Sequence, residues 1–151
     1  MDAMLSFPEV NELSEDVRKV FEELDRHHDP TCPTCTGVYT PALDVMETAE
    51  TVEVLVDLPG VTADGVRVLL KHGALVVAGE KASPEPCSPE HAFHLVERGF
   101  GRFARVVRLA IPVDARGTRA SLRAGELRIT IPRIKERRGE EIVVAIETVG
   151  A

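Results

Sequence analysis

Aromatic side chains are scarce in this chain, and their scarcity restricts how a core can be built. Phe, Trp and Tyr together make up 4% of the 151 residues, with no Trp and a single Tyr, whereas apolar residues as a whole make up 44%. The core must therefore be built mainly from Val, Leu, Ile and Ala. A chain of this length corresponds to one ordinary domain with additional arms.

Long apolar runs, a secretory leader and paired cysteines are also missing. No apolar run approaches the roughly 18 residues of a membrane-spanning helix. The N-terminus lacks the basic start and apolar stretch of a secretory signal. Three cysteines, an odd number, do not suggest a disulfide scaffold. We therefore expect a cytoplasmic protein that does not bind membranes.

The charge is acidic and unevenly spread, which bears on the class of partner. The net charge is −7, and residues 1–40 carry nine acids and three bases, a net −6. Nucleic acid is therefore not expected as a partner, because phosphate neutralisation needs clustered Lys and Arg. The sequence has no glycine-rich phosphate loop ending in Lys and no convincing acid–base pair. We expect neither an enzyme nor a bound cofactor.

The first 26 residues carry a helical pattern. Ser6, followed by Pro8 and Glu9, is a helix-start signature. An isolated helix of this length is marginal in water, so its apolar stripe must dock on its own domain, a sister subunit or a client. The stripe is the expected client-binding or assembly face, and it comprises Val10, Leu13, Val17, Val20, Phe21 and Leu24.

A linker rich in Pro and Thr follows at residues 27–40, so we assign residues 1–40 to an N-terminal arm. It contains a Cys-x-x-Cys sequence with two histidines upstream, and thiolates with imidazoles can complete a tetrahedral zinc site. The second cysteine pair of a full zinc motif is absent, as is the strand–helix setting of a thioredoxin-type redox motif. An inert linker is favoured over zinc or redox chemistry at Cys32, Cys35, His27 and His28.

Residues 41–132 are dominated by short strands, because apolar and polar residues alternate there between Pro- and Gly-containing turns. About ninety residues with seven or eight strands favour an all-β, immunoglobulin-like β-sandwich. The expected strands cover residues 42–46, 52–58, 66–71, 74–79, 93–97, 102–109, 119–123 and 127–131.

The last two of these strands form a distinctive hairpin. Ala120 and Leu122 alternate with polar residues before the turn at Ala124-Gly125, and Leu127 begins the return strand. Glycine reaches positive φ without steric cost, which suits a tight reversal. Pro132 should end the second strand, because it has no amide hydrogen for the ladder.

Four motifs follow one another in this region. They are residues 54–61 with an acidic-Leu-Pro-Gly turn, residues 75–81 ending in Gly-Glu-Lys, residues 96–112 with paired strands before Ile-Pro, and Ala120, Gly125 and Leu127 in the hairpin. In this order the motifs resemble the small heat shock proteins of the bacterial and archaeal type, which belong to the alpha-crystallin family.

The resemblance implies an alpha-crystallin domain at residues 41–132, with a helical N-terminal arm and a flexible C-terminal extension at residues 133–151. It further implies an ATP-independent holdase, which binds partly unfolded proteins and prevents their aggregation under stress. The alternative is a co-chaperone-like adaptor of related sandwich fold with one fixed protein partner.

The resemblance also implies a homo-oligomer built from dimers. In such dimers a short strand after the long loop joins the partner's sheet, which here would be the segment 93–97. Arginines on either side would pair with carboxylates at the dimer interface, or else remain solvated strand charges. The expected interface residues are Phe93, Leu95, Glu97, Arg98 and Arg105.

A C-terminal Ile-x-Ile type motif in this family docks in a groove of a neighbouring subunit. The equivalent residues 146–148 have Thr in the second aliphatic position, and burying an unpaired hydroxyl costs energy. We therefore expect Val144 and Ile146 to be the anchors, with residues 142–144 as an alternative. The groove would be lined by Val68, Leu70, Leu122 and Leu127.

Overall fold

The computed structural model describes residues 6–26, 38–82, 90, 93–135, 141 and 143–147. Within these residues the chain forms one α-helix, one 3-10 turn and seven strands. In chain order they are α1 (Phe7–Asp25), β1 (Leu43–Glu47), β2 (Thr51–Asp57), η1 (Ala63–Gly65), β3 (Val66–Lys71), β4 (Ala74–Lys81), β5 (Gly101–Arg108), β6 (Arg119–Arg123) and β7 (Glu126–Pro132).

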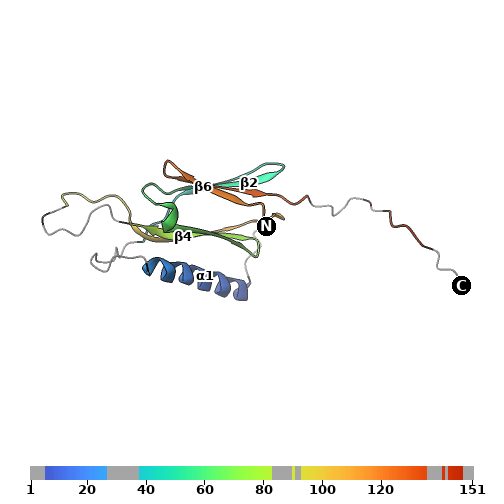
Figure 1. The fold of residues 1–151 in the computed structure, drawn as a ribbon, viewed down its shortest axis with the longest axis horizontal. Coiled ribbons are helices and arrows are strands. Elements are labelled where there is room, and N and C mark those ends of the chain that lie inside the picture. Colours follow the sequence, from blue (N-terminus) through green and yellow to red (C-terminus); the bar gives the residue numbers. More distant parts are fainter. Residues whose placement is uncertain are drawn as a thin grey trace.

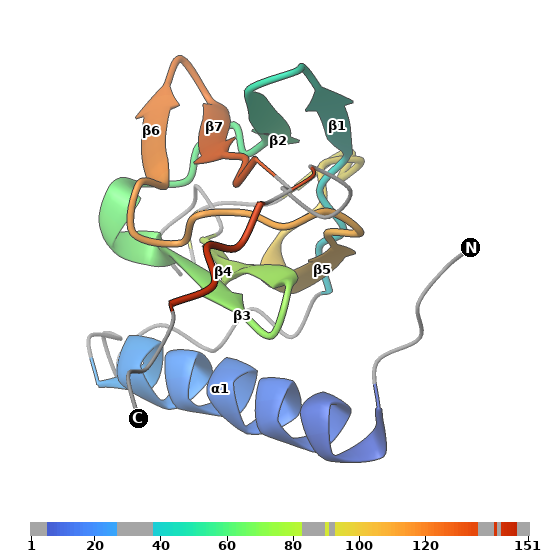
Figure 2. The same ribbon diagram turned by 90° about the vertical axis from the view of Figure 1, so that its right-hand side faces the viewer.

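The strands form two antiparallel sheets that pack face to face. One sheet has the order β1-β2-β7-β6 and the other the order β3-β4-β5. Figure 1 shows the two sheets as separate layers, with α1 as a third layer on the outer side of the three-stranded sheet; Figure 2 shows the same arrangement from the end. The predicted β-sandwich with a helical N-terminal arm is confirmed.

The core is built from inward-facing aliphatic residues of both sheets. In the central pair β2 and β7, Val54 lies opposite Ile129 and Val56 opposite Leu127, and all four are at most 3% exposed. From the other sheet, Phe103 is the largest fully buried side chain. Each such residue contributes about 1.5–3 kcal/mol when it leaves water. A low aromatic content is therefore compatible with a well-packed core.

The β6–β7 hairpin turns through two residues with positive φ, Ala124 at 51° and Gly125 at 77°. Two consecutive positive φ values suit the twist of a two-residue hairpin. The Leu58 amide donates to the Gly125 carbonyl at 2.7 Å, and a Cβ at position 125 would lie 3.0 Å from Pro59 Cα. Two of the four sequence motifs therefore contact each other at this end of the sandwich.

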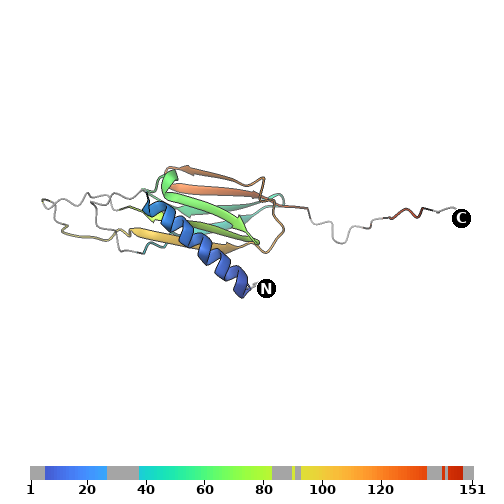
Figure 3. The ribbon, with the colours of Figure 1, turned by 60° about the horizontal axis from the view of Figure 1, so that its bottom comes forward.

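Helix α1 packs on its own domain. The Ser6 amide donates to Glu9 Oε2 at 2.7 Å, which confirms the predicted helix start. Leu13 and Val20, 4% and 6% exposed, lie against an outer patch of the three-stranded sheet formed by Ala74, Val76 and Ala78. Figure 3 shows α1 running diagonally across these strands. The sequence left three docking partners open for the helix, and in this structure α1 contacts its own domain.

The predicted strand at residues 93–97 is not a strand in this chain. Residues 93–100 run as an irregular segment up to Gly101, where β5 begins. A strand exists only when a neighbour accepts and donates its backbone hydrogen bonds. Within the described part of this single chain, the segment has no such neighbour.

A substitution at Gly79 tests how tightly β4 packs against the 3-10 turn η1. A Cβ at this position would overlap the carbonyl oxygen of Gly65 and lie 2.8 Å from Phe103 Cζ. We expect Gly79→Ala to lower the free energy of unfolding by about 1–3 kcal/mol, as in other overpacked cores. Urea unfolding measures this change. Gly65→Ala is the control, because its Cβ would meet its nearest neighbour, Glu80 O, at 3.4 Å. Equal unfolding midpoints for the two variants would contradict the packing argument.

Candidate protein-binding surfaces

One candidate surface lies where the two sheets present edge strands on the same side of the sandwich. Arg105 on β5 donates to the Pro41 carbonyl at 2.7 Å, which places β5 beside the chain entering β1. The opposite edges, β3 and β6, therefore lie next to each other. Among the described strands, β3 pairs with β4 alone and β6 with β7 alone. Both outer edges offer backbone groups for strand addition.

The residues predicted to line the docking groove lie at this pair of edges. Val68 and Leu70 on β3 and Leu122 on β6 are half-buried and pack against the same core cluster. Leu127 is 3% exposed and belongs to the core beneath them, on β7. The structure thus places three of the four predicted side chains, half-buried, on the two adjacent edge strands.

The predicted docking segment of the C-terminal extension is extended and solvent-exposed. Val143, Val144 and Ile146 are 84%, 78% and 94% exposed. Figure 1 shows residues 143–147 far from the sandwich. These apolar side chains have no cover from the described residues of their own chain.

The segment 93–97 is a second exposed apolar surface. Phe93, Leu95 and Val96 are 61%, 74% and 59% exposed. On the other side of the four-stranded sheet, strand β1 is an edge as well, and its Val45 and Met46 are nearly half exposed. Among the described residues, the segment 93–97 and the outer edge of β1 are therefore both apolar and unpaired.

The two predicted interface arginines occupy different settings. Arg105 is half-buried and donates to a backbone carbonyl rather than to a carboxylate. The Arg98 guanidinium lies 5.4 Å from the centre of the Phe100 ring, a cation–π contact. In the described part of the chain, neither arginine is paired with a carboxylate.

Lys81, which follows the Gly-Glu pair of the second motif, is a buried cation that the sequence analysis missed. It is 5% exposed, and its ammonium lies 4.7 Å from the centre of the Tyr39 ring and 5.8 Å from that of Phe100. Burial, and secondly the positive charge of Arg98, lower the pKa of this amine. No local sequence pattern signals this burial, because the contact with Tyr39 joins segments that are distant in sequence.

Ion pairs surround the apolar contact between α1 and its sheet. Lys71 lies 2.5 Å from Glu12 and 3.2 Å from Asp16, and Glu12 also contacts His72 at 2.7 Å. Farther along, Arg67 pairs with Glu23 at 3.1 Å, and Arg102 pairs with Asp25. The hydrogen bond from Lys71, and secondly the one from His72, lowers the pKa of Glu12. The hydrogen bonds that Lys71 donates to Glu12 and to Asp16 raise the pKa of Lys71.

Of the expected client-binding face, Leu13 and Val20 are buried in this contact, whereas Val17, Phe21 and Leu24 are half-buried. Val10 is 44% exposed. The ring of Phe21 lies 5.1 Å from the Arg102 guanidinium. Most of the stripe is therefore shielded while α1 stays docked.

The four residues considered for zinc, Cys32, Cys35, His27 and His28, lie outside the described residues. Among the residues that are described, no group of three or more His, Cys, Asp and Glu side chains could hold a metal ion. In the same part of the chain, no helix has the length and apolar character needed to cross a membrane.

Comparison with known proteins agrees with this architecture. Residues 44–147 match the Hsp20/alpha crystallin family. The chain is 34% identical over 101 residues to Heat shock protein 16 of Schizosaccharomyces pombe, covering 66% of this chain and 71% of the relative. It is 36% identical over 107 residues to Spore protein SP21 of Stigmatella aurantiaca, covering 71% of this chain and 63% of the relative.

Solved structures show the same fold. Heat shock protein 16.0 from Schizosaccharomyces pombe superposes with a TM-score of 0.61 at 33% identity, covering 72% of this chain and 99% of the other. A small heat-shock protein from Xylella fastidiosa gives a TM-score of 0.60 at 29% identity, and the match covers 75% of this chain and 98% of the other. The chain therefore belongs to the small heat shock proteins, the stress-response chaperones built on the alpha-crystallin domain.

Proposed function

We propose that this protein is an ATP-independent holdase, which binds partly unfolded proteins and keeps them from aggregating. The observation that carries the proposal is the exposure of large apolar side chains on two extended segments, residues 93–96 and 143–146, beside a fully packed core. Partly unfolded proteins expose apolar surface and strand edges of the same kind. Covering such surface needs no catalytic group and no nucleotide.

Dimer formation by strand exchange is the second part of the proposal. The segment 93–97 of one copy would add to the free edge of β1 in its partner, and its apolar residues would cover Val45 and Met46. Both surfaces are unpaired in the described single chain. Arg98 directly follows this segment, and Arg105 is tied to the chain just before β1, so both would flank the interface.

Tail docking is the third part. Val144 and Ile146 of one copy would enter the opening between β3 and β6 of another, against Val68, Leu70 and Leu122. The half-burial of those three side chains supports this placement, because an added strand would complete their burial.

The stripe on α1 is proposed as a client-binding face that becomes available when the helix leaves its sheet. The buried apolar contact is small, with Leu13 and Val20 as its central residues. The cross-element ion pairs are largely solvent-exposed, and such pairs contribute little stability individually. Release of α1 would therefore cost far less than unfolding of the sandwich.

The chaperone activity is tested by heating a thermolabile enzyme with this protein in nucleotide-free buffer. We expect an equimolar amount of subunits to suppress most of the turbidity, because client apolar surface is covered as it appears. Light scattering at 360 nm follows the aggregation, with serum albumin at equal mass as the control. Undiminished turbidity, or suppression that requires ATP, would refute the holdase proposal.

The strand exchange is tested with Leu95→Asp in an Ile146→Asp background, which separates dimerisation from tail docking. A carboxylate replacing a side chain buried at the interface should weaken the dimer by about tenfold or more. Sedimentation velocity over a concentration series measures the dissociation constant. His94→Asp is the matched control, because neighbouring strand residues face opposite sides.

Deleting residues 84–96, which removes most of the exchanged segment, should give monomers. A stable dimer after the deletion would show that another surface joins the subunits.

The ion pairs of α1 predict a pH dependence of helix docking. The pKa of Glu12 is lowered from 4.5 on docking, so its contribution is complete above pH 4.5 and is lost as the pH falls through the docked pKa. The pKa of Lys71 is raised from 10.5, so its contribution is lost only at more alkaline pH. At pH 7, Glu12→Gln should make α1 amides exchange hydrogen faster than in the wild type.

The ratio of the two exchange rates, measured at the same pH, should return toward one as the pH falls through the lowered pKa of docked Glu12, because protonated Glu12 resembles Gln. Glu15→Gln is the control, because Glu15 pairs with Arg18 of the same helix. A ratio that stays constant with pH would show that the Glu12 carboxylate does not hold the helix.

A further inference from the structure

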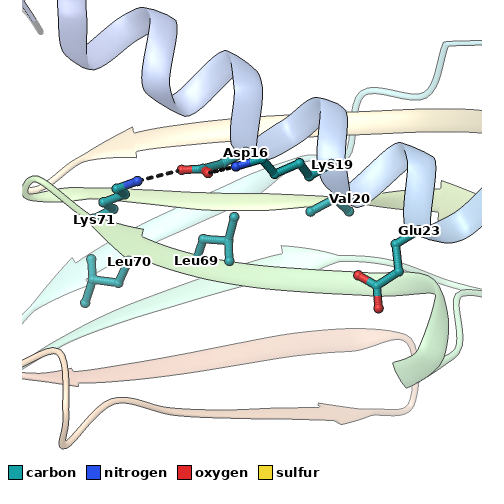
Figure 4. A pocket seen from close by; sticks show the side chains of 7 residues that line it. All are labelled: Asp16, Lys19, Val20, Glu23, Leu69, Leu70 and Lys71. Atoms are coloured by element: carbon teal, nitrogen blue, oxygen red, sulfur yellow. Dashed lines mark hydrogen bonds and ion pairs between the residues drawn. The ribbon is translucent and has the colours of Figure 1, made fainter.

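A cleft of about 420 Å³ opens between α1 and the edge strand β3. Its volume lies within the range of roughly 300–1,000 Å³ that ligand sites occupy. Figure 4 shows the side chains that line it, with Val20 and Leu69 facing each other across the helix–sheet boundary. The lining residues that matter here are Asp16, Lys19, Val20, Glu23, Leu69 and Leu70.

The cleft follows the free edge of β3. Leu69 packs with the cluster beneath α1, whereas its neighbour Leu70 packs with the sandwich core. Both residues line the cleft, which therefore runs along β3, and this strand has no partner on its outer edge among the described strands. An extended segment bound there would continue the sheet, with alternate side chains facing the core and the helix.

The sequence of the C-terminal extension matches such a two-sided site. If Val144 and Ile146 face the sandwich core, Val143 and Ala145 face the opposite side. A groove with one apolar wall would leave this second side in water and favour polar residues there. Instead, residues 142–146 are continuously apolar, as in strands that are buried on both faces.

We propose that α1 forms the second wall of the tail-docking site, so that Val143 and Ala145 of a second copy of this chain enter the cleft between α1 and β3. This inference rests on the proposed tail docking and adds the helix to it. Val20 and Leu69 supply the apolar contact for these two small side chains. Docking of α1 on its sheet and docking of a neighbour's tail then support each other.

The charges around the cleft make the inference testable at Ala145. Asp16, Lys19 and Glu23 line the helix side, and Lys71 lines the sheet side. Asp16 lies 3.2 Å from Lys71 and 3.9 Å from Lys19, and Glu23 lies 3.1 Å from Arg67, so both acids are already paired with cations. A carboxylate added at position 145 would be desolvated beside cations that are already paired. An ammonium added there has a long stem, which would let it reach water.

The experiment uses labelled peptides of residues 140–148 and the full-length Ile146→Asp chain as receptor, because its own tails should not compete. Fluorescence anisotropy gives the dissociation constants of four peptides: native, Ala145→Asp, Ala145→Lys and Ile146→Asp. We expect Ala145→Asp to bind at least about tenfold more weakly than native, and Ala145→Lys within about threefold of native. A receptor that also carries Glu23→Gln should reduce the penalty of Ala145→Asp.

The outcomes separate the two proposals. Equal binding of the native and Ala145→Asp peptides, with loss of binding for Ile146→Asp, would show that the tail docks without α1 and would overturn this inference alone. No binding of the native peptide, or equal binding of the Ile146→Asp peptide, would overturn tail docking itself. In a receptor with Val20→Asp, which removes the helix wall, native and Ala145→Asp peptides should bind alike; a persistent tenfold difference would contradict a role for α1.

Discussion

The unpaired sheet edge is the constraint on which the rest of this structure depends. Two stacked sheets bury their inner faces against each other, but they do not close into a barrel. In the described chain, β1, β3 and β6 each have one open side, while β5 is partly covered by Val38 and Tyr39. An exposed apolar edge invites pairing with any extended chain. In the proposed holdase, the same edges would bind clients or other subunits.

The chain carries apolar elements that suit these open edges. The irregular segment 93–97 has the apolar side chains to cover β1, and residues 143–147 have those to fill the opening between β3 and β6. Helix α1 lies across the outer face of the three-stranded sheet and borders the β3 edge. Under the proposed function, the same edges would be covered either by another subunit or by a client, and the two would exclude each other at a given edge.

The sandwich could be predicted from the sequence because its period-two pattern is determined by burial on one face. Val52, Val54 and Val56 alternate with exposed or half-buried residues, and they are buried as expected. The segment 93–97 could not be judged in the same way. It has an apolar alternating sequence, yet a strand depends on a partner for its backbone hydrogen bonds, and the described part of this single chain does not provide one. A pattern can show that a segment suits a sheet without showing whose sheet it joins.

The same limit applies to the candidate sites. The apolar stripe of α1 predicted that something covers Leu13 and Val20, but the small residues Ala74 and Ala78 that receive them gave no comparable signal. Lys81 escaped notice because a lysine after Gly-Glu resembles an ordinary surface cation, and only the fold brings Tyr39 and Phe100 beside it. Contacts between segments distant in sequence require the tertiary structure.

The weakness of the helix contact follows from these same residues and gives it a functional meaning. Alanines offer little area to a helix, so the apolar contribution of Ala74 and Ala78 is small beside that of the sandwich core. The surrounding ion pairs are partly exposed, and such pairs add little stability individually. If a neighbour's tail also contacts α1, the loss of that tail leaves the helix less firmly held. Dissociation of subunits would then expose the β3 edge and the apolar stripe of α1 together, which couples disassembly to the surface available for clients.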